Sequence, residues 1–411
     1  MMSKSMIVHE FKMMMKNKKN VLFIIALVSL ILSYCFLILP AKETPDSFDP
    51  EAMKTEIKNL EAVSEGMIAR GGTGTGGYTG VAAYANNVYA QKVQSRMIKA
   101  FEDDNLNRFI QLRMKGFDYD GQSVNRDWRL YANAPYSYLD QSREVSLKNL
   151  RYQGYLNENI KVTYKMIEQK TALQTVVNFL LGTTAFMVLF CAIYFSSDML
   201  SKDRQHRTIL QGLPIGWYRL INVKSMVAFF YTMLILFGLL LLTVIIIGIQ
   251  NGFGSFKLSV PITIPSTQPD DYFGYRFSEY DTISIAKFLL LAIGIIPILI
   301  YLFIRLNAIL SLIFKNSWIV LMVSSLLLFS ERIYYSRTLT ELFGIEISNM
   351  PQTYFDFGRI ISGEKYYLVT LESITYEKGI IVLLSTVLVL EVTLFVVSQI
   401  VSKRRFYRKA A

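Results

Sequence analysis

The stretch Val21-Leu-Phe-Ile-Ile-Ala-Leu-Val-Ser-Leu-Ile-Leu-Ser-Tyr-Cys-Phe-Leu-Ile-Leu39 contains no charged residue. A helix of about 20 apolar residues crosses the hydrocarbon core of a bilayer, so this stretch predicts a membrane span. Three lysines precede it, as in a secretory signal, but the apolar run is too long for a signal core and no convincing cleavage site follows. We therefore interpret Val21–Leu39 as a retained membrane anchor.

Five further apolar segments follow, the first only after about 135 mostly polar residues. They are Val176–Ser197, Ser225–Gln250, Ile283–Phe303, Trp318–Ser330, which is the shortest, and Gly379–Val401. The chain is 52% hydrophobic and only 18% charged, which is less charge than a soluble globule of this length carries. The sequence therefore predicts an all-α polytopic membrane protein with six transmembrane helices.

The net charge of +11 is concentrated in short segments. Residues 1–20, 198–224 and 402–411 each hold five Lys or Arg, and Arg305 and Lys315 flank another short loop. Short basic loops remain in the cytoplasm, so we expect a multi-pass protein of the cell membrane with both termini cytoplasmic. The basic excess then reflects topology and contact with anionic lipids, and we expect no nucleic-acid partner.

These boundaries divide the chain into six parts. Residues 1–20 form an interfacial amphipathic helix, because Met6, Ile7, Phe11, Met14 and Met15 share one helical face and lysines lie opposite. A frayed basic terminus is the alternative. The other parts are the first span (21–40), an extracellular, mostly helical domain (41–175), spans two to five with a cytoplasmic loop at 198–224 (176–330), an extracellular re-entrant segment (331–378), and the last span with a basic tail (379–411).

The insert between the first two spans has a helical pattern with two interruptions. Apolar residues from Met53 to Met67 follow near-heptad spacing up to a glycine-rich break, and a second helix is expected from Val81 to Phe109. From about Ser146 a third helix is expected to run without a breaker into the second span. Three aromatic residues between these helices could stack on a partner or a peptide, or pack within a small domain: Trp128, Tyr131 and Tyr136.

Two shorter exported segments receive different predictions. Residues 251–282 contain Pro261, Pro265 and Pro269 and predict a loop. The segment 331–378 is too apolar for a free loop, so we expect short helices around Leu339–Ile347 and Phe355–Ile361. The insert contains no cysteine, which suits a protein of a Gram-positive bacterium.

No catalytic, cofactor-binding or metal-binding residue is expected on this chain. The pattern Gly72-x-Gly74-x-x-Gly77 follows a predicted helix where a dinucleotide site requires a strand, so we interpret it as a hairpin tip. A phosphate-binding loop of the Gly-x-x-x-x-Gly-Lys-Ser/Thr type is missing, and neither His9 nor His206 belongs to a catalytic grouping. We therefore expect that the chain is not an enzyme and that any ATP binds to another polypeptide.

Cys35, Cys191 and Glu391 all fall inside predicted spans. The two cysteines are interpreted as small buried hydrophobic residues. A carboxylate inside a membrane often marks an ion path or a helix contact. For Glu391 we favour a neutral glutamic acid that is hydrogen-bonded to a neighbouring helix at a subunit contact.

The most specific stretch is Asp198-Met-Leu-Ser-Lys-Asp-Arg-Gln-His-Arg-Thr-Ile-Leu-Gln-Gly-Leu-Pro-Ile-Gly-Trp-Tyr-Arg-Leu-Ile-Asn-Val-Lys224. A charged turn precedes a short amphipathic helix, and a second short helix leads to the lysine at the third span. Here the chain resembles the permease subunits of type-2 ABC transporters, in which this loop docks into the ATPase. The resemblance assigns that role to Asp203, Thr208, Ile209, Leu210, Leu213, Pro214, Arg219 and Lys224.

The loop Leu306–Asn316 resembles the second ATPase contact of this family, through Leu310, Phe314 and Lys315. The likeness also includes the interfacial helix, the six spans and the re-entrant segment, and it leaves the 41–175 insert outside. One departure is His206-Arg207 before Thr208, where the family often has an acidic residue and a glycine.

The resemblance implies the permease subunit of an ATP-driven exporter, with hydrophobic or amphipathic peptides, antibiotics or lipid-like molecules as cargo. Two ATPase subunits would bind ATP and Mg, and a second copy or a related permease would complete the complex. The alternative is a non-transporting ABC subunit that transmits ATP-driven motion to the insert, for sensing or for control of a wall enzyme. Such subunits usually have four spans.

Overall fold

The computed structural model describes residues 2–74, 83–118, 137–158, 160–202, 216–265, 279–334, 337 and 339–407. The chain is 76% helical. Among the described residues, four helices are long and apolar enough to cross a membrane: Lys18–Ala41, α12 (Trp217–Asn251), α13 (Ile285–Ile313) and α17 (Tyr376–Ile400). A fifth is counted if α9 (Ala172–Leu181) and α10 (Ala185–Ser196) form one bent span. These helices confirm the class of a mostly helical, polytopic membrane protein.

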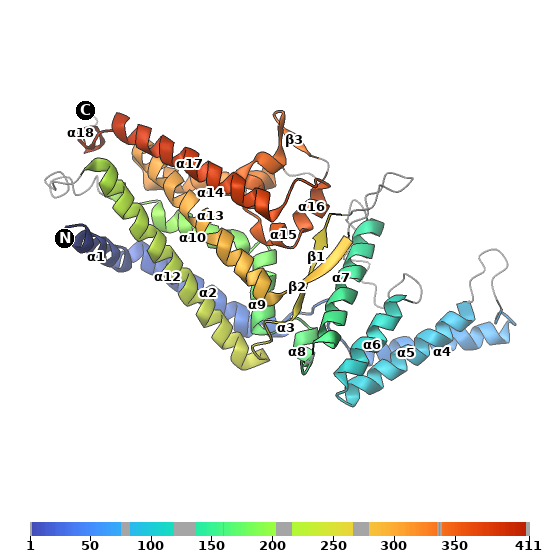
Figure 1. Ribbon diagram of the computed structural model, residues 1–411. Coiled ribbons are helices and arrows are strands. Elements are labelled where there is room, and N and C mark those ends of the chain that lie inside the picture. The colour runs from blue at the N-terminus through green and yellow to red at the C-terminus, as the bar shows by residue number, and fades with distance from the viewer. Residues whose placement is uncertain are drawn as a thin grey trace.

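The apolar helices form one bundle in which both chain termini lie at the same end (Figure 1). The helix α1 (Met2–Lys16) precedes α2 (Lys18–Ser33), which continues through a π-helical turn, η1 (Tyr34–Ile38), into α3 (Leu39–Ala41). The most buried of the four long helices is α13. The side chains of Leu22, Ile249 and Leu388 are 65–78% exposed on the outer helices, as expected of surfaces that face lipid.

The predicted second span is not one straight helix. The helices α9 and α10 are bent by 72° at a break of three residues, Gly182–Thr184. The predicted fifth span corresponds to α14 (Ser317–Tyr334), which packs against α10 and α13 but is not among the four helices above.

The described part of the insert contains four helices of 13 to 21 residues and one short helix: α4 (Pro50–Ala69), α5 (Ala83–Glu102), α6 (Leu106–Asp118), α7 (Ser137–Asn157) and α8 (Tyr164–Ile167). Asp49 caps α4 by accepting from the backbone N–H groups of Glu51 and Ala52, and Pro50 occupies the first turn. The predicted helix Val81–Phe109 is interrupted at Asp104, whose φ is +52°. Figure 1 shows α4 and α5 as a hairpin that extends away from the bundle.

The expected continuous helix from the insert into the second span is wrong. The helix α7 ends at Asn157, Thr163 caps α8 through its side chain, and Gln169 has a φ of +57° before α9 begins. Threonine and glutamine side chains form local or tertiary hydrogen bonds here, which compete with a continuous helix. The insert is therefore joined to α9 through a turn.

Residues 251–282 do not form a simple loop as predicted. The strand β1 (Ser259–Ile264) pairs with β2 (Glu279–Ser284) in an antiparallel register from Ser259 opposite Ser284 to Ile264 opposite Glu279. Pro261 is tolerated because each strand of a two-stranded sheet has a free edge.

The segment after α14 was predicted in part. The expected helix Leu339–Ile347 is wrong: β3 (Glu341–Leu342) and β4 (Ile345–Glu346) form a hairpin, with positive φ at Phe343 and Gly344. The second expected helix is confirmed as α15 (Phe357–Ile361). Short helices complete this part: η4 (Ile347–Asn349), η5 (Pro351–Tyr354), α16 (Glu364–Val369) and, after α17, α18 (Lys403–Tyr407).

The insert is fastened to these connections through α7. A Cβ atom on Gly154 would lie 2.0 Å from the Ser259 hydroxyl, so glycine permits the close approach of α7 to β1. Arg337 forms a bidentate ion pair with Asp140 at 2.8 and 2.9 Å, and Tyr367 donates to the same carboxylate at 2.8 Å. Three segments far apart in sequence thus form one unit at the end of the bundle opposite the termini (Figure 1).

Candidate functional site

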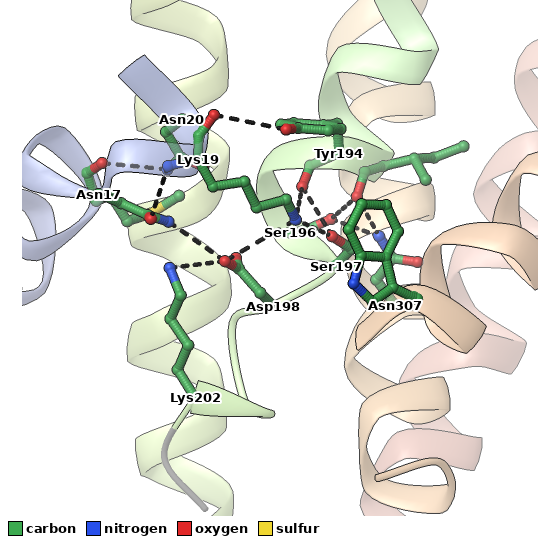
Figure 2. Close-up of polar contacts among 12 residues, drawn as sticks. Asn17, Lys19, Asn20, Tyr194, Ser196, Ser197, Asp198, Lys202 and Asn307 are labelled. Carbon is green, nitrogen blue, oxygen red and sulfur yellow. Dashed lines mark hydrogen bonds and ion pairs between the residues drawn. The ribbon is translucent and has the colours of Figure 1, made fainter. Parts of the chain in front are cut away.

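Residues 198–202, which precede the undescribed segment 203–215, belong to a cluster of polar side chains centred on Asp198. This carboxylate lies just beyond the C-terminus of α10, where the helix dipole disfavours negative charge. It is 6% exposed, and Lys202 pairs with it at 2.6 Å while Asn17 donates to it at 3.2 Å. We call Asn17, Lys19, Asn20, Tyr194, Ser197, Asp198 and Lys202 the loop-base cluster (Figure 2).

The loop-base cluster connects the start of the first span to the end of the second. Lys19 donates to the Ser197 hydroxyl at 2.8 Å, lies 3.9 Å from the Asp198 carboxylate, and lies 4.4 Å from the centroid of the Tyr194 ring. Asn20 is fully buried and donates to the carbonyl of Met14 at 3.1 Å. A displacement of the segment at Asp198 would therefore act directly on the junction of α1 and α2.

A buried amide joins α10 to α13 and α14. The side-chain nitrogen of Asn307 donates to the Ile193 carbonyl at 2.9 Å and to the Ser196 hydroxyl at 2.7 Å. The Ser324 hydroxyl donates to the Asn307 side-chain oxygen. Asn307 has no exposed surface, so these bonds are made in an apolar environment, where a lost partner is costly.

The N-terminal helix is fastened to α12 through charge and aromatic contact. Glu10 pairs with Lys224 at 2.8 Å, and Phe11 meets Tyr231 edge-on at 5.7 Å between ring centroids. Lys224 is 4% exposed. Lys224 was predicted to follow a second short helix, but one helix of 35 residues begins at Trp217 and contains it.

Glu391 bonds to a neighbouring helix, as predicted, and one partner there is a cation, which was not predicted; the neutral state and the subunit contact stay predictions. Arg305 lies on α13, 2.6 Å from the Glu391 carboxylate, and is 5% exposed. Tyr301 donates to the same carboxylate at 2.6 Å, and Tyr218 of α12 approaches its other oxygen at 3.4 Å. A second bond from Arg305 to Asn222, at 2.8 Å, connects α13 to α12.

An apolar cluster brings the two predicted ATPase-contact segments together. Leu200 at the base of the loop packs with Ile221 of α12, Leu312 of α13 and Leu394 of α17. The Trp217 indole N–H donates to the Val401 carbonyl at 2.9 Å. The start of α12 is therefore held against the ends of α13 and α17.

The predicted site residues have different outcomes. Arg219 is exposed on the first turn of α12, Leu310 and Phe314 are half-buried at the end of α13, and Lys315 is exposed just beyond it. The predicted role of these residues in binding an ATPase stays a prediction. The others lie outside the described residues: Asp203, Thr208, Ile209, Leu210, Leu213, Pro214, Trp128, Tyr131 and Tyr136.

Sequence reasoning missed Arg305 and Asn307 as buried residues because it ended the fourth span at Phe303. The signal was present, since Ala308, Ile309 and Leu312 continue the apolar pattern beyond them. Nothing in the local sequence indicated the contacts of Asn17, Lys19 and Glu10, because their partners lie on other helices.

The arrangement suits the transmission of force between helices, and its side chains form ion pairs and hydrogen bonds across helix ends. Within the described part of the chain, no group of three or more His, Cys, Asp or Glu side chains could hold a metal ion.

Comparisons with protein-family models, with curated proteins and with solved structures found no match to this chain.

Proposed function

We propose that the chain is the membrane-spanning permease subunit of an ATP-driven ABC exporter in the cell membrane of a Gram-positive bacterium. One observation carries the proposal: the base of the loop 203–215, the start of α12 and the end of α13 lie together at the end of the bundle that holds both termini. These are the segments that the family resemblance assigns to the ATPase contact. This end is then cytoplasmic, as the basic residues require.

Six spans, with an extracellular insert, fit the path of the chain. The backbone of Ala172 at the start of α9 bonds to Gly252 beyond the end of α12, whereas Asp198 beyond the end of α10 meets Lys19 at the start of α2. The pair α9–α10 thus leads from one end of the bundle to the other. Similarly, α14 begins just after Lys315 and ends near the contact of Arg332 with Asp356 at 3.3 Å. Both segments then cross the membrane.

In this proposal, two ATPase subunits bind ATP and Mg and close against two permease subunits. Closure displaces residues 203–224 and 306–316. The loop-base cluster passes the displacement to α2, and the Arg305–Glu391 pair passes it from α13 to α17, so the spans move against one another. The cargo class, a hydrophobic or amphipathic peptide, antibiotic or lipid-like molecule, rests on family analogy alone.

A second candidate is a non-transporting ABC subunit that moves the insert. The close packing of α7 on β1 and the Asp140–Arg337 ion pair favour it, because they connect the insert to the spans. A count of four crossing helices in an accessibility map would support this candidate over the exporter.

Affinity purification of the tagged full-length chain from its own host tests both ABC functions. We expect an ATPase subunit to accompany the chain and its ATP hydrolysis to be stimulated. The double variant Ile209→Asp with Leu213→Asp should lose this stimulation, whereas Thr55→Asp with Ala62→Asp, on the exposed face of α4, should keep it. If no ATPase accompanies the chain and none is stimulated, both ABC functions fail; normal activity of the first double variant overturns the docking-loop assignment alone.

A further inference from the structure

The break between α9 and α10 exposes polar groups within an apolar span. Asn178, Thr183 and Thr184 are exposed, although the helices on either side are strongly apolar. We call these three residues together with Gly182 the polar break. Hydrocarbon does not solvate irregular backbone or amide groups, so such a break persists in a membrane only where it is covered by protein or lines a water-filled space.

The carbonyls within the polar break are bonded locally: those of Gly182, Thr183 and Thr184 accept from the first three N–H groups of α10 at 3.2, 3.2 and 3.0 Å. The N–H of Gly182 donates to the Asn178 carbonyl at 3.0 Å, and the Thr184 hydroxyl donates to the Phe179 carbonyl. Within the residues that the structure describes, the carbonyl of Leu181, the last residue of α9, accepts no hydrogen bond. The first N–H groups of α10 are occupied within the break, so the unbonded carbonyl at the C-terminus of α9 is the group left to accept from a cation or an N–H donor.

A second irregularity lies beside the first. The π-helical turn Tyr34–Ile38 interrupts the first span, and the Tyr34 ring is 4.7 Å from the Phe179 ring between centroids. Single π-helical turns inside helices frequently mark functional sites. This ring contact places the two irregularities at the same level of the bundle, about 24 Å along the first span from Lys18. Aromatic faces next to a helix C-terminus suit a cationic group.

We propose that the polar break and the adjacent Tyr34–Phe179 pair bind the primary-amine head of an amphipathic molecule. Asn178, Thr183 and Thr184 supply neutral hydrogen-bonding groups, the end of α9 supplies negative potential, and no carboxylate is required. The interpretation of this ligand as cargo rests on the proposed exporter function. Discontinuous spans with exposed helix ends form the substrate sites of other transporter folds, which is the same physical solution.

The test uses thiol accessibility in the purified full-length chain in lipid nanodiscs. The native cysteines, Cys35 and Cys191, are 0% and 2% exposed, so the wild-type chain gives a low background. We expect Thr183→Cys to react with a charged methanethiosulfonate at least about tenfold faster than Leu388→Cys, because a thiolate forms only where water enters. Leu388 is the matched control, since its side chain is 65% exposed on an apolar face of α17.

The ligand class is tested by protection of Thr183→Cys with three dodecyl probes. Dodecylamine, protonated at neutral pH, should slow the reaction, whereas dodecanol and dodecyl sulfate should not. Asn178→Ala in the same background should weaken protection about fivefold, as loss of one hydrogen bond predicts. Unchanged elution and thermal midpoint of each variant would show that it is folded.

Three results would overturn the proposal. Reaction no faster than that of Leu388→Cys would mean that lipid covers the break. A slow reaction together with disulfide-linked dimers on mild oxidation would mean that a second copy covers it. Equal protection by all three probes would mean apolar partitioning without recognition of the amine. None of these measurements requires an ATPase, so failure here is distinct from failure of the exporter proposal.

Discussion

Asp46 is a buried carboxylate that is surrounded by three cations. It has no exposed surface, and it pairs with Arg151 at 2.6 Å and with Lys148 at 3.0 Å. The Tyr152 hydroxyl also donates to it at 2.6 Å, and Arg113 donates to its main-chain carbonyl at 2.8 Å. This cluster fastens the segment after the first span to α6 and α7.

The unequal number of cations and carboxylates moves two pKa values. Burial raises the pKa of Asp46, but Arg151, Lys148 and Arg113 outweigh it and hold that pKa well below its usual range. Burial lowers the pKa of Lys148 to about 8; Asp46 opposes this effect and Arg113 adds to it. The one carboxylate therefore remains charged, while the lysine loses its proton more readily than in water.

Lys148 should make the stability of the insert depend on pH in the alkaline range. Between pH 8 and 10.5 the unfolded chain binds a proton at this lysine that the folded chain does not, so stability rises with pH across this window. The free energy of unfolding should rise by up to about 3 kcal/mol across this window. In thermal unfolding of the full-length chain in detergent, the midpoint of the wild type should rise relative to that of Lys148→Met from pH 8 to pH 10.

Lys58→Met provides the control, because Lys58 is exposed on α4. Its midpoint should follow the wild type at every pH. If the thermal midpoints of the wild type and Lys148→Met changed in parallel with pH, the lowered pKa would not belong to Lys148.

Asp46 affects stability in the acid range. Because its pKa is lowered in the folded chain, the charged carboxylate contributes stability above its unfolded pKa of 3.8, and this stability is lost as acid protonates Asp46.

These clusters could not be predicted from sequence because their members are far apart in the chain. Asp46 lies between Pro45 and Pro50 in what reads as a linker, and Arg151 follows 105 residues later. Arg305 and Glu391 were each visible as charges near apolar runs, but nothing local pairs them. Local patterns report periodicity, whereas pairing depends on the tertiary fold.

At the scale of elements, the break in the second span is accompanied by close packing from α15. A Cβ atom on Gly358 would lie 1.8 Å from the Leu180 carbonyl oxygen and 2.5 Å from its carbon. Only glycine allows α15 to approach the backbone at the end of α9. The position of α15 thus depends on a residue with no side chain.

Gly358→Ala should therefore destabilise the protein. Backbone atoms cannot move aside as a flexible side chain can, so the added methyl group should force α15 away from α9 at a cost of about 1–3 kcal/mol. Gly238→Ala in α12 is the matched control, since nothing lies within 4 Å of its added Cβ. Alanine there should be neutral or stabilising by up to about 1 kcal/mol. Thermal midpoints in one detergent compare the two, and equal midpoints would exclude close packing at Gly358.

The elements differ in how far the sequence predicts them. Apolar length identified the four long apolar helices and the bent pair α9–α10, because membrane crossing depends on composition along about 20 residues. Apolar length carries no information about the direction of the helix axis, so it did not predict the bend at Gly182–Thr184. The strands β1 and β2 were missed because Pro261 reads as a loop signal, although it is tolerated in a two-stranded sheet.

At the scale of the whole molecule, the two ends of the bundle hold separate polar clusters. One end holds both termini, the loop-base cluster and the Glu10–Lys224 pair. The other end holds α7, β1 and β2, with the Asp140–Arg337 pair. The basic segments predicted this division, since charge distribution depends only on composition. The attachment of the insert to the later connections could not be predicted, because it depends on contacts about 200 residues apart in sequence.

This division predicts, in intact cells, the labelling pattern of variants that each carry one added cysteine. Lys58→Cys in α4 and Phe343→Cys in the β3–β4 hairpin should react with a membrane-impermeant thiol reagent, and Phe343 is 93% exposed. Lys315→Cys and Lys403→Cys should react only after permeabilisation. The buried native cysteines keep the background low.

The pair Lys315 and Phe343 decides whether α14 crosses the membrane, because these residues flank it. An 18-residue helix is about 27 Å long, close to the thickness of the hydrocarbon core, so crossing is feasible but requires Glu331 and Arg332 to lie at one end. Both have partners there: Lys365 pairs with Glu331, and Arg332 pairs with Asp356. These ion pairs neutralise the charges of Glu331 and Arg332 at the outer end of α14, so the helix can cross the membrane. In that case the thiol reagent should label a cysteine at position 343 from outside the cell but not one at position 315. Labelling of both residues from the same side would mean that α14 enters and leaves the same leaflet, which would remove the predicted fifth span and leave five.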